Sequence, residues 1–590
     1  MRASQFYQSN ISSLESEKML LERKLRNYRL VRLFVFLITL LGAYFTFGHI
    51  LMFSSVLVVS IVLFLVMVAK YTDLKTENEI VKTKINLCNA ELNALKGDLS
   101  DFDSGAKYVN AKHPFSSDLD LFKKNGVFAF LNRTTSDLGK KRLVSMLLDG
   151  NKNANEVSNI IDILSKNISW SIHFRAVALI NSRGTGKAKL LSSLPFSDFS
   201  NAPWMKIAKF LIPIVSFGAL ILFNLELISS GLFSILMLLM LAPASKELKK
   251  TNAISNELSN IEERLKVIRD QMNSLPMLSN ATIFELQWIE EMLGDKPLDI
   301  RNEMDELLKI LHRFNTRNNM LLGMVFNCFL GWDIFQRIAL ENWTNKNKSK
   351  VTRLENGLAT LEALTSVAFV RFNYPETIYA LETNNHSMVM KGLFHPLLAH
   401  AKSIENDFQL VPSKQFMILT GPNMAGKSTY LRAVACAVIF ANAGFPVFAS
   451  EYSCPNVQLY TSMRTSDDLS ENSSYFFAEL SRLRIIMDAV ESDKYVFVLL
   501  DEILKGTNSK DKEEGSYLFM EKMQKLGAKG IIATHDLSLC QLESKNEAFF
   551  TGHFDSIIYG SDLSFDYKLK NGICQNMNAS FLLKKMKLTD

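Results

Sequence analysis

The chain has few cysteines for its length, and they are widely separated. Its six cysteines are scattered over 590 residues without a CxxC pair, which argues against a disulfide framework and against a zinc site. We interpret them as buried or inert thiols in a reducing compartment. The chain also has no large excess of positive or negative charge. A net charge of +6 is mild for this length and by itself gives no reason to expect a nucleic-acid-binding protein.

Low-complexity segments, clear internal repeats and a disordered composition are lacking as well. With 48% hydrophobic and 21% charged residues, the chain is too apolar to be disordered, and its length predicts several domains. A cleavable signal peptide is not expected, because the first apolar run begins only near Leu30, after a charged stretch, and lacks a small-residue cleavage pattern.

Two apolar runs, 33–47 and 50–69, are separated only by Gly48 and His49. Neither run contains Asp, Glu, Lys or Arg, and together they are long enough to cross a bilayer twice. Basic residues precede the first run and follow the second, whereas the turn has none, so the positive-inside rule places both ends in the cytoplasm. The alternative, a hairpin buried in a soluble core, is disfavoured because soluble helices seldom stay apolar on all faces for so long.

A second apolar block, 210–242, is broken near residues 224–226. Each half has only about fifteen residues, fewer than the roughly 20 of a comfortable span, but lysines flank the block on both sides. We prefer a second membrane hairpin with Glu226 hydrated in its turn; a re-entrant pair and a buried core hairpin remain alternatives. Apolar residues at helical spacing predict further helices over 11–30, 72–99, 246–275 and 283–345.

From Gln415 onward, short apolar runs alternate with helical stretches. This alternation predicts an α/β domain built on a mainly parallel sheet. The strand-like runs are 416–419, 457–460, 496–500 and 530–533.

The segment GPNMAGKS at 421–428 fits the pattern G-x-x-x-x-G-K-[ST]. It follows a strand-like run and opens an expected helix over 430–441, the setting in which backbone N–H groups close around phosphates. Lys427 would reach the β- and γ-phosphates, and Ser428 would ligate Mg²⁺. We therefore expect an ATP-binding loop. Its residues are Gly421, Pro422, Asn423, Met424, Ala425, Gly426, Lys427, Ser428 and Thr429.

Two further strand-like runs end in residues suited to the same chemistry. Asp501 and Glu502 follow the run at 496–500; Asp501 would hold magnesium through water, and Glu502 would polarise the attacking water. His535 follows the run at 531–533 and would sense the γ-phosphate or position water. Each feature alone is weak, since an acidic strand cap or a structural histidine is common, but the ordered set favours catalytic roles for Lys427, Glu502 and His535.

These residues carry a resemblance to a known family. Residues 419–432, LTGPNMAGKSTYLR, closely resemble the P-loop segment of MutS mismatch-repair proteins, with Ala425 where the family has glycine. Residues 501–511, DEILKGTNSKD, resemble the family's DEIGRGTST-x-D stretch, with Leu-Lys for Gly-Arg and Asn for Ser. The sequence Ala-Thr-His at 533–535 completes the series.

Other segments resemble MutS proteins in pieces. Residues 467–479 look like the segment that presents a serine to the partner subunit's nucleotide; Ser474 falls on that serine, and a tyrosine replaces the threonine that follows it. Residues 552–572 are similar to the family's closing hairpin. Upstream, residues 118–139 look like the start of the helical core, and residues 392–396 resemble the R-H-P element before the ATPase domain.

The sequence also departs from the family pattern. An apolar hairpin occupies the N-terminal region in place of a mismatch-reading domain with its Phe-x-Glu wedge. The aromatic residue that stacks on adenine in the family has only Ser403 as its nearest match, so base stacking must come from elsewhere or be weaker. The second apolar hairpin has no counterpart in mismatch-repair MutS proteins, and mismatch sensing is in doubt.

The resemblance implies an α/β P-loop ABC-type ATPase domain with a mainly parallel sheet, C-terminal to an all-α MutS-like core. The apolar runs add two transmembrane helical hairpins to this fold. It also implies a homodimer that sandwiches two ATP molecules with Mg²⁺, Ser474 of one subunit completing the site of the other. The expected plan is an N-terminal amphipathic helix at 1–32, a hairpin at 33–69, a cytoplasmic linker at 70–114, the core at 115–206 and 244–389, a second hairpin at 207–243, and the ATPase domain at 390–590.

Two functional hypotheses follow. The first is a membrane-anchored ATPase that couples ATP to double-stranded DNA with a mismatch, damage or a branch, with a MutL-like or other protein partner. The second is a membrane-tethered switch that acts on a protein partner without mismatch recognition. A true ABC transporter is disfavoured, because four spans are few and carry no internal charge that suggests a polar pathway. Both hypotheses place a multi-pass protein in the cytoplasmic membrane with its ATPase domain in the cytoplasm.

Overall fold

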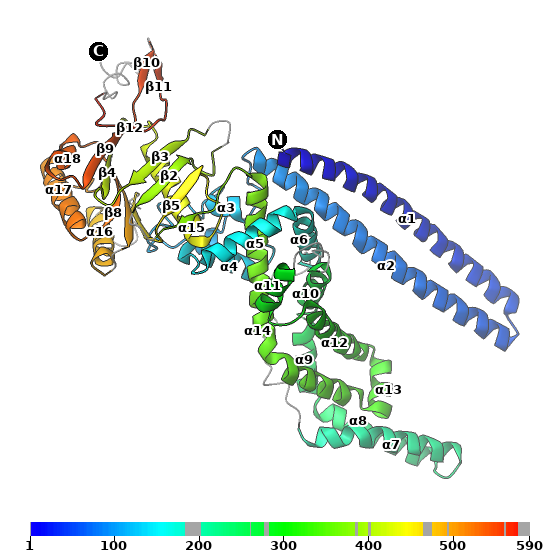
Figure 1. The fold of residues 1–590 in the computed structure, drawn as a ribbon. Helices are drawn as coiled ribbons and strands as arrows, with labels where there is room; N and C mark the ends of the chain where they lie inside the picture. Colours follow the sequence, from blue (N-terminus) through cyan, green and yellow to red (C-terminus); the bar gives the residue numbers. More distant parts are fainter. Residues whose placement is uncertain are drawn as a thin grey trace. The chain divides into compact units, whose positions relative to one another are not determined.

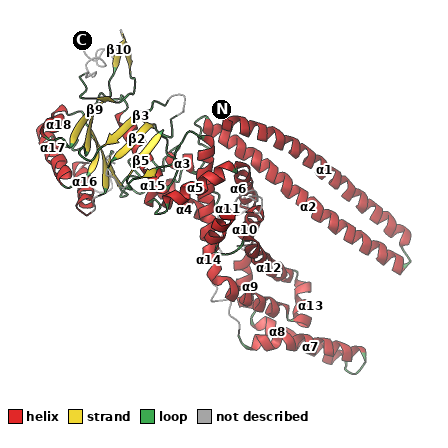
Figure 2. Cartoon of the chain, viewed as in Figure 1, coloured by secondary structure: helices red, strands yellow, loops and turns green. Residues whose placement is uncertain are grey.

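The computed structural model describes residues 2–182, 202–259, 261–275, 283–383, 387–398, 403–463, 475–492, 495–559 and 562–575. The chain divides into two compact units, each discontinuous in sequence (Figure 1). We call residues 6–89 with 169–361 the helical unit, and residues 1–5, 90–168 and 362–590 the sheet unit. Within the described residues, strands occur only in the sheet unit, as the colouring of Figure 2 shows.

Two very long helices, α1 (Arg2–Thr46) and α2 (Ile50–Leu95), open the chain. The predicted charged helix and the first apolar run form one continuous helix, α1, which ends where Gly48 adopts φ +104°. The second apolar run and the charged stretch after it likewise form the single helix α2. Further helices are α6 (Ile168–Ser182), α7 (Trp204–Asn224), α8 (Ser230–Lys246), α9 (Leu248–Ser259), α10 (Glu262–Ser274), α11 (Ile283–Leu293), α12 (Pro297–Asn315), α13 (Met320–Leu330) and α14 (Trp332–Asn373).

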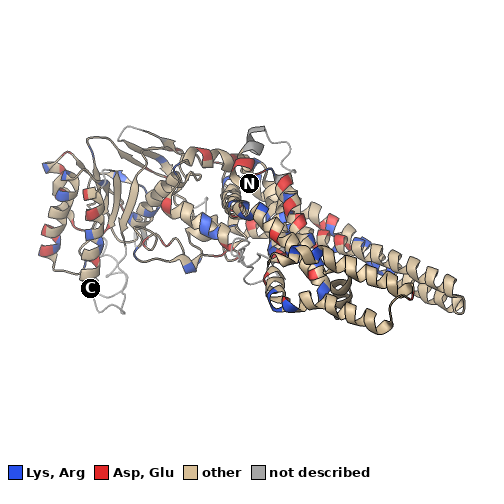
Figure 3. Ribbon diagram, turned by 90° about the horizontal axis from the view of Figure 1, so that it is seen from below, with Lys and Arg blue, Asp and Glu red and all other residues tan. Residues whose placement is uncertain are grey.

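Three of the described helices, α1, α2 and α7, are long and apolar enough to cross a membrane. A fourth span results if α8 and α9, which meet at a bend of 57°, count as one. The most apolar windows of α1 and α2 have no buried residue, and Figure 3 shows long stretches of helix without charged side chains. The helix α7 is longer than the apolar run of about fifteen residues that it contains. It has 21 residues, because it begins six residues before that run.

A short apolar helix, α13, packs against both helices of the second hairpin. The hydroxyl of Ser216 on α7 donates to the carbonyl of Cys328 on α13 at 2.7 Å, and the thiol of Cys328 lies 3.4 Å from the sulfur of Met237 on α8. Other α13 side chains remain exposed, among them Leu321 at 78% and Met324 at 52%. The hairpin is therefore part of a three-helix cluster, which the sequence did not reveal.

The sheet unit holds a six-stranded main sheet in the order β12-β9-β4-β8-β7-β6 and a four-stranded sheet in the order β1-β5-β2-β3. In the main sheet all neighbours pair in parallel except β12, which is antiparallel to β9. The strands are β1 (Leu381–Glu382), β2 (Met388–Leu393), β3 (Asn406–Leu410), β4 (Phe416–Thr420), β5 (Glu451–Cys454), β6 (Gln458–Ser462), β7 (Val496–Asp501), β8 (Lys529–Ala533), β9 (Phe549–His553), β10 (Ile557–Tyr559), β11 (Asp562–Ser564) and β12 (Lys570–Asn571).

The prediction of an α/β region with a mainly parallel sheet is confirmed. The central strands β4, β7 and β8 are buried along nearly their whole length, as expected for parallel strands covered on both faces. One face carries a core built with side chains from α16 and α17. The helices of this unit are α3 (Val127–Leu131), α4 (Asp137–Asp149), α5 (Ala154–Lys166), α15 (Lys427–Ala443), α16 (Tyr475–Ser492), α17 (Ser509–Lys525) and α18 (Gln541–Lys545).

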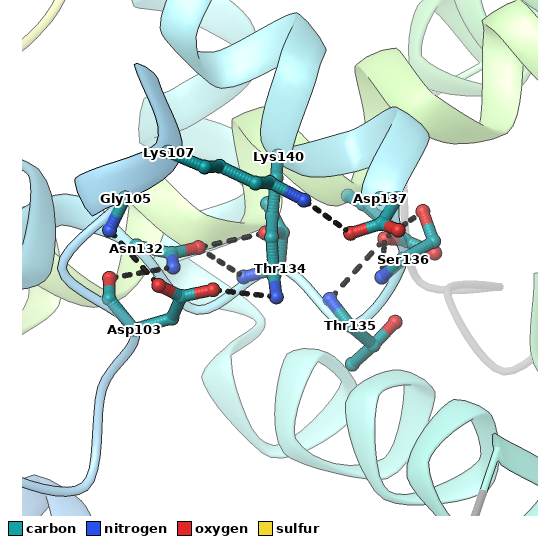
Figure 4. A network of polar contacts seen from close by, with 10 residues as sticks. Asp103, Gly105, Lys107, Asn132, Thr134, Thr135, Ser136, Asp137 and Lys140 are labelled. Carbon is teal, nitrogen blue, oxygen red and sulfur yellow. Dashed lines mark hydrogen bonds and ion pairs between the residues drawn. The ribbon is translucent and has the colours of Figure 1, made fainter. Parts of the chain in front are cut away.

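The helices α4 and α5 pack on α15, far along the sequence. A polar network surrounds the N-terminal end of α4 (Figure 4). The Ser136 hydroxyl caps this helix and donates to the carboxylate of Glu362 at 2.8 Å. An ion pair between Lys140 and Asp103 at 2.7 Å lies beside it. At the other end of α4, the Asn151 N–H donates to the carbonyl of Asn442 at the end of α15 at 2.8 Å. This part of the predicted helical core is thus attached directly to the helix that follows the GPNMAGKS loop.

Candidate functional site

Three neighbouring strands bring the predicted site residues to one edge of the main sheet. The strand β8 lies between β4 and β7, and Ala533 at its end is in register with Leu419 on one side and Asp501 on the other. Because the three strands run parallel, the residues that follow them meet at their carboxyl ends, where α/β sheets bind ligands. The loop at 421–428, the pair Asp501-Glu502 and the side chain of His535 therefore converge.

The loop at 421–428 needs glycine at two positions. Gly421 has φ +143°, and a Cβ there would lie 2.6 Å from the carbonyl oxygen of Phe554. Gly426 has φ +107° and is the N-cap of α15. Ala425, where the MutS pattern has glycine, has no positive φ, so alanine fits without backbone strain. The glycines of the pattern thus have a steric reason in this fold.

Lys427 is buried at the start of α15, with its ammonium turned back onto the loop. Its Nζ donates to the carbonyl oxygens of Gly421 at 2.7 Å and of Pro422 at 3.1 Å, and lies 3.2 Å from Nε2 of His535. Burial lowers the pKa of Lys427, and the carboxylates of Glu502 and Asp501 oppose that shift. The loop therefore holds the ammonium at its centre through two main-chain oxygens, with the His535 ring beside it.

Ser428 and Asp501 form the arrangement expected of a magnesium site. The Ser428 hydroxyl donates to Oδ2 of Asp501 at 2.6 Å, and both oxygens are hard donors of the kind Mg²⁺ prefers. Among the described residues there is no group of three or more His, Cys, Asp or Glu side chains that could hold a metal ion. A metal held here would need water and phosphate oxygens as its other ligands, which is the usual situation for Mg²⁺ bound with a nucleotide.

The carboxylate of Glu502 is held from two sides. Oε1 lies 2.9 Å from Nε2 of His535, and Oε2 lies 3.3 Å from the ammonium of Lys505. The hydrogen bond from His535, followed by the charge of Lys505, lowers the pKa of Glu502 to about 2 against the opposing effect of burial. Nε2 of His535 also lies 2.7 Å from Oδ1 of Asn423 in the loop. Glu502 is thus ionised near neutral pH, and His535 links it to the loop.

A pocket of about 440 Å³ opens beside this cluster. Its walls include loop residues and Glu502, and also side chains that sequence reasoning did not assign: Phe394, Ile404, Tyr430, Phe554 and Tyr567. Ser403, the nearest sequence match to the family's adenine-stacking aromatic residue, is not among the wall residues. The Tyr567 ring comes so close to the loop that a Cβ on Gly426 would lie 3.2 Å from it. The available signal was an aromatic residue within 552–572, the segment similar to the family's closing hairpin.

Ser474 lies outside the described residues, as does the stretch 464–474 that precedes α16. Its role therefore stays a prediction from the sequence. The helix α16, Tyr475–Ser492, follows it directly.

Comparison with known proteins agrees with this arrangement in the C-terminal region. Residues 417–588 match the family model described as MutS domain V. The C-terminal region is a MutS domain V. The match begins within β4 and includes every strand end described above.

The chain is also similar to individual proteins of the MutS family. The chain is 30% identical over 216 residues to the DNA mismatch repair protein MutS of Thermotoga maritima, covering 36% of this chain and 26% of that protein. It is 31% identical over 244 residues to MutS protein homolog 4 of Homo sapiens, covering 40% of this chain and 25% of that protein. The chain thus spans about a quarter of the length of each relative.

Proposed function

We propose that this chain is an ATPase that binds ATP with Mg²⁺ at the edge formed by the loop 421–428, Asp501, Glu502 and His535. The observation that carries the proposal is the convergence of a buried lysine, a serine–aspartate pair and an ionised glutamate beside one pocket. MutS-family proteins are ATPases, and the domain V match lies on these residues.

Each residue has a defined task in this proposal. The Lys427 ammonium exchanges its main-chain partners for the β- and γ-phosphates, and the N–H groups at the start of α15 donate to phosphate oxygens. Ser428 and Asp501 hold the ion, which supplies neutralisation of phosphate charge. Glu502 orients water for attack, and His535 holds the Glu502 carboxylate in place and senses the γ-phosphate.

The aromatic wall of the pocket is the proposed substitute for the adenine-stacking residue. Tyr567 is 43% exposed, and its backbone is anchored by the Asn406 amide, which donates to the Tyr567 carbonyl at 3.0 Å. A ring that is both anchored and accessible is suited to stack on a nucleobase. This assignment explains how a base is held although Ser403 has no ring.

We also propose that the protein is a homodimer in the cytoplasmic membrane. Ser474 of each subunit would complete the partner's site. The spans would be α1 with α2 and α7 with α8, and the exposed apolar side chains of α7 and α13 would face lipid. The Lys and Arg residues at the ends of these helices support a cytoplasmic position for the sheet unit.

The work done with ATP is proposed to be the handling of double-stranded DNA with a mismatch, damage or a branch. The names of the matched relatives, DNA mismatch repair proteins, support this choice. The second candidate is a membrane-tethered switch acting on a protein partner, MutL-like or other. It is favoured by the apolar hairpin in the N-terminal region. Salt-dependent DNA binding by the detergent-solubilised protein separates the two: a DNA handler loses affinity steeply as salt rises, whereas a protein switch shows no binding at any salt concentration.

The ATPase proposal is tested by Lys427→Ala in the full-length protein. Removing the ammonium should abolish phosphate release and weaken ATP binding, while Lys414→Ala, a lysine outside the site, should leave turnover unchanged. Phosphate release by a coupled assay and nucleotide binding by filter retention measure both effects. Near-normal turnover in Lys427→Ala would contradict the site assignment.

A further inference from the structure

The turn after β7 has an unusual backbone. Glu502 has φ +50° and Leu504 has φ +59°, a region that few residues other than glycine adopt. Leu504 is also buried, 7% exposed, and its side chain packs into the core beneath the main sheet. Non-glycine residues persist in this conformation only where their surroundings hold them. A specific contact must therefore hold the turn that presents Glu502.

That contact is a buried carboxylate on the neighbouring helix α16. Glu479 is 3% exposed. Its Oε1 accepts the backbone N–H of Leu504, and its Oε2 accepts the backbone N–H of Lys505 at 3.1 Å. Both carboxylate oxygens are thus used on two consecutive main-chain donors of one turn. A neutral side chain cannot reproduce this, because an amide offers only one acceptor oxygen.

The start of α16 approaches the same turn closely. A Cβ on Gly506 would lie 2.8 Å from Cβ of Phe476, so the turn lies directly against the helix, with no space for a side chain at position 506. Burial raises the pKa of Glu479, while its hydrogen bonds to the N–H groups of Leu504, Lys505 and Gly506 act against that shift. The carboxylate is therefore committed to this turn although ionisation in a buried place is unfavourable.

The two hydrogen bonds from the turn to Glu479, which we call the Glu479 clamp, also affect the groups around Glu502. Lys505, whose N–H is bound by Glu479, places its ammonium 3.3 Å from the Glu502 carboxylate. On the other side, the Glu502 N–H donates to the carbonyl of Ala533 at 2.9 Å. The backbone of Glu502 is thus fixed by the sheet before the turn and by Glu479 after it.

We propose that Glu479 is a positioning residue for Glu502: its buried carboxylate holds the left-handed turn at Leu504 and so fixes the direction in which the Glu502 side chain points. This inference rests on the proposed ATPase function, in which Glu502 orients water. It adds a residue that touches neither nucleotide nor ion, on a different element of the fold.

The test is Glu479→Gln in the full-length protein, with Glu491→Gln as the matched control. Glu491 lies on the same helix, where its carboxylate pairs with Arg484 and Lys522 at the surface. We expect kcat to fall about 10- to 100-fold in Glu479→Gln, because a small misplacement of a catalytic group has costs of this order. The KM for ATP should stay within about twofold, since the loop at 421–428 is untouched. Glu491→Gln should behave like the wild type.

A second substitution separates positioning from simple stability. Leu504→Gly removes the need for a clamp, because glycine adopts φ +59° freely. In the Glu479→Gln background it should recover at least several-fold of the lost kcat even though it removes buried side-chain volume. If Glu479→Gln is not recovered folded, Glu479→Asp with and without Leu504→Gly makes the same comparison.

The outcomes are distinguishable from failure of the ATPase proposal. If the wild type does not hydrolyse ATP, the proposed function itself is wrong. If the wild type is active and Glu479→Gln keeps its kcat, or loses kcat and ATP binding together with no recovery from Leu504→Gly, the positioning role is overturned. A fall in kcat alone, reversed by Leu504→Gly, supports it.

Discussion

The sheet unit and the helical unit differ in where their functional information lies. In the sheet unit, a few polar residues at the ends of three buried strands make the candidate site, and each has a defined partner within about 3 Å. In the helical unit, whole apolar faces are exposed, with residues such as Leu51 at 81% and Ile214 at 70%. Sequence motifs therefore predict the site of the sheet unit, whereas the length and composition of the apolar runs predict the character of the helical unit.

The largest expected effect concerns the helical unit and is measured by where the protein is found in the cell. If the exposed apolar faces of the helical unit lie in lipid, the native protein should be recovered entirely with the cytoplasmic membrane and should resist carbonate extraction. Reporter fusions should place both termini inside. A control that deletes only the sheet-unit segment from Lys414 onward should keep the membrane location. Recovery of the intact chain in the soluble fraction would mean that these helices are covered by protein instead.

The next largest effect concerns Glu502 in the sheet unit. Glu502→Gln should still bind ATP but turn over about 10²–10⁴-fold more slowly, because the general-base contribution is lost. The variant should accumulate as a closed dimer on ATP addition, which size-exclusion chromatography in detergent detects. Glu521→Gln, a carboxylate that pairs with Lys525 on the surface of α17, is the control. A variant that neither slows nor changes its oligomeric state would count against the role of Glu502.

Much of the sheet unit was predictable because local signals and fold agree there. Each strand run and the glycines of the 421–428 loop have a local cause: buried β-strands, positive φ at Gly421 and Gly426, and parallel pairing that brings strand ends together. The membrane hairpins were predictable only as apolar helices of sufficient length, so their crossing of a bilayer stays a prediction, as do the seven domain ranges.

What could not be predicted depends on contacts between distant parts of the chain. The packing of α13 on α7 and α8 joins residues about a hundred positions apart, and the Glu479 clamp joins a helix to a turn beyond the next strand. The pocket wall at Tyr567 depends on how a short hairpin folds back over the loop. No periodicity or motif encodes such pairings, because many alternative partners have equivalent sequence patterns.

A smaller effect is expected from Ser474, the predicted contribution of one subunit to the other's site. Ser474→Ala should leave nucleotide binding by the monomer nearly intact but weaken ATP-driven dimerisation about ten- to a hundredfold, since a hydrogen bond to a charged oxygen contributes about 1.5–3 kcal/mol. If Ser474 merely caps α16, alanine would instead cost about 1 kcal/mol of local stability.

The two readings of Ser474 separate when Ser474→Ala subunits are mixed with Lys427→Ala subunits. If the serine acts on the partner, each mixed dimer places both defects in one composite site and leaves the other site whole, so activity returns. Flat activity at every mixing ratio, with mixed dimers demonstrably formed, would show that the serine does not act in trans.

The smallest expected effect concerns Tyr567, the residue of the pocket wall that we propose stacks on the base because Ser403 has no ring. Tyr567→Ala should raise the KM for ATP about fivefold with kcat nearly unchanged, because stacking on a base contributes about 1–3 kcal/mol and this ring is partly exposed. Tyr567→Phe keeps the ring and should match the wild type, while Phe565→Ala removes a neighbouring ring that is not part of the pocket wall. Tyr567→Ala should not alter the affinity for inorganic triphosphate, which has no base. An equal loss for ATP and triphosphate would mean that Tyr567 supports the loop at Gly426 rather than the base, and the base would then have to be held by another residue of the pocket wall, such as Phe394 or Ile404.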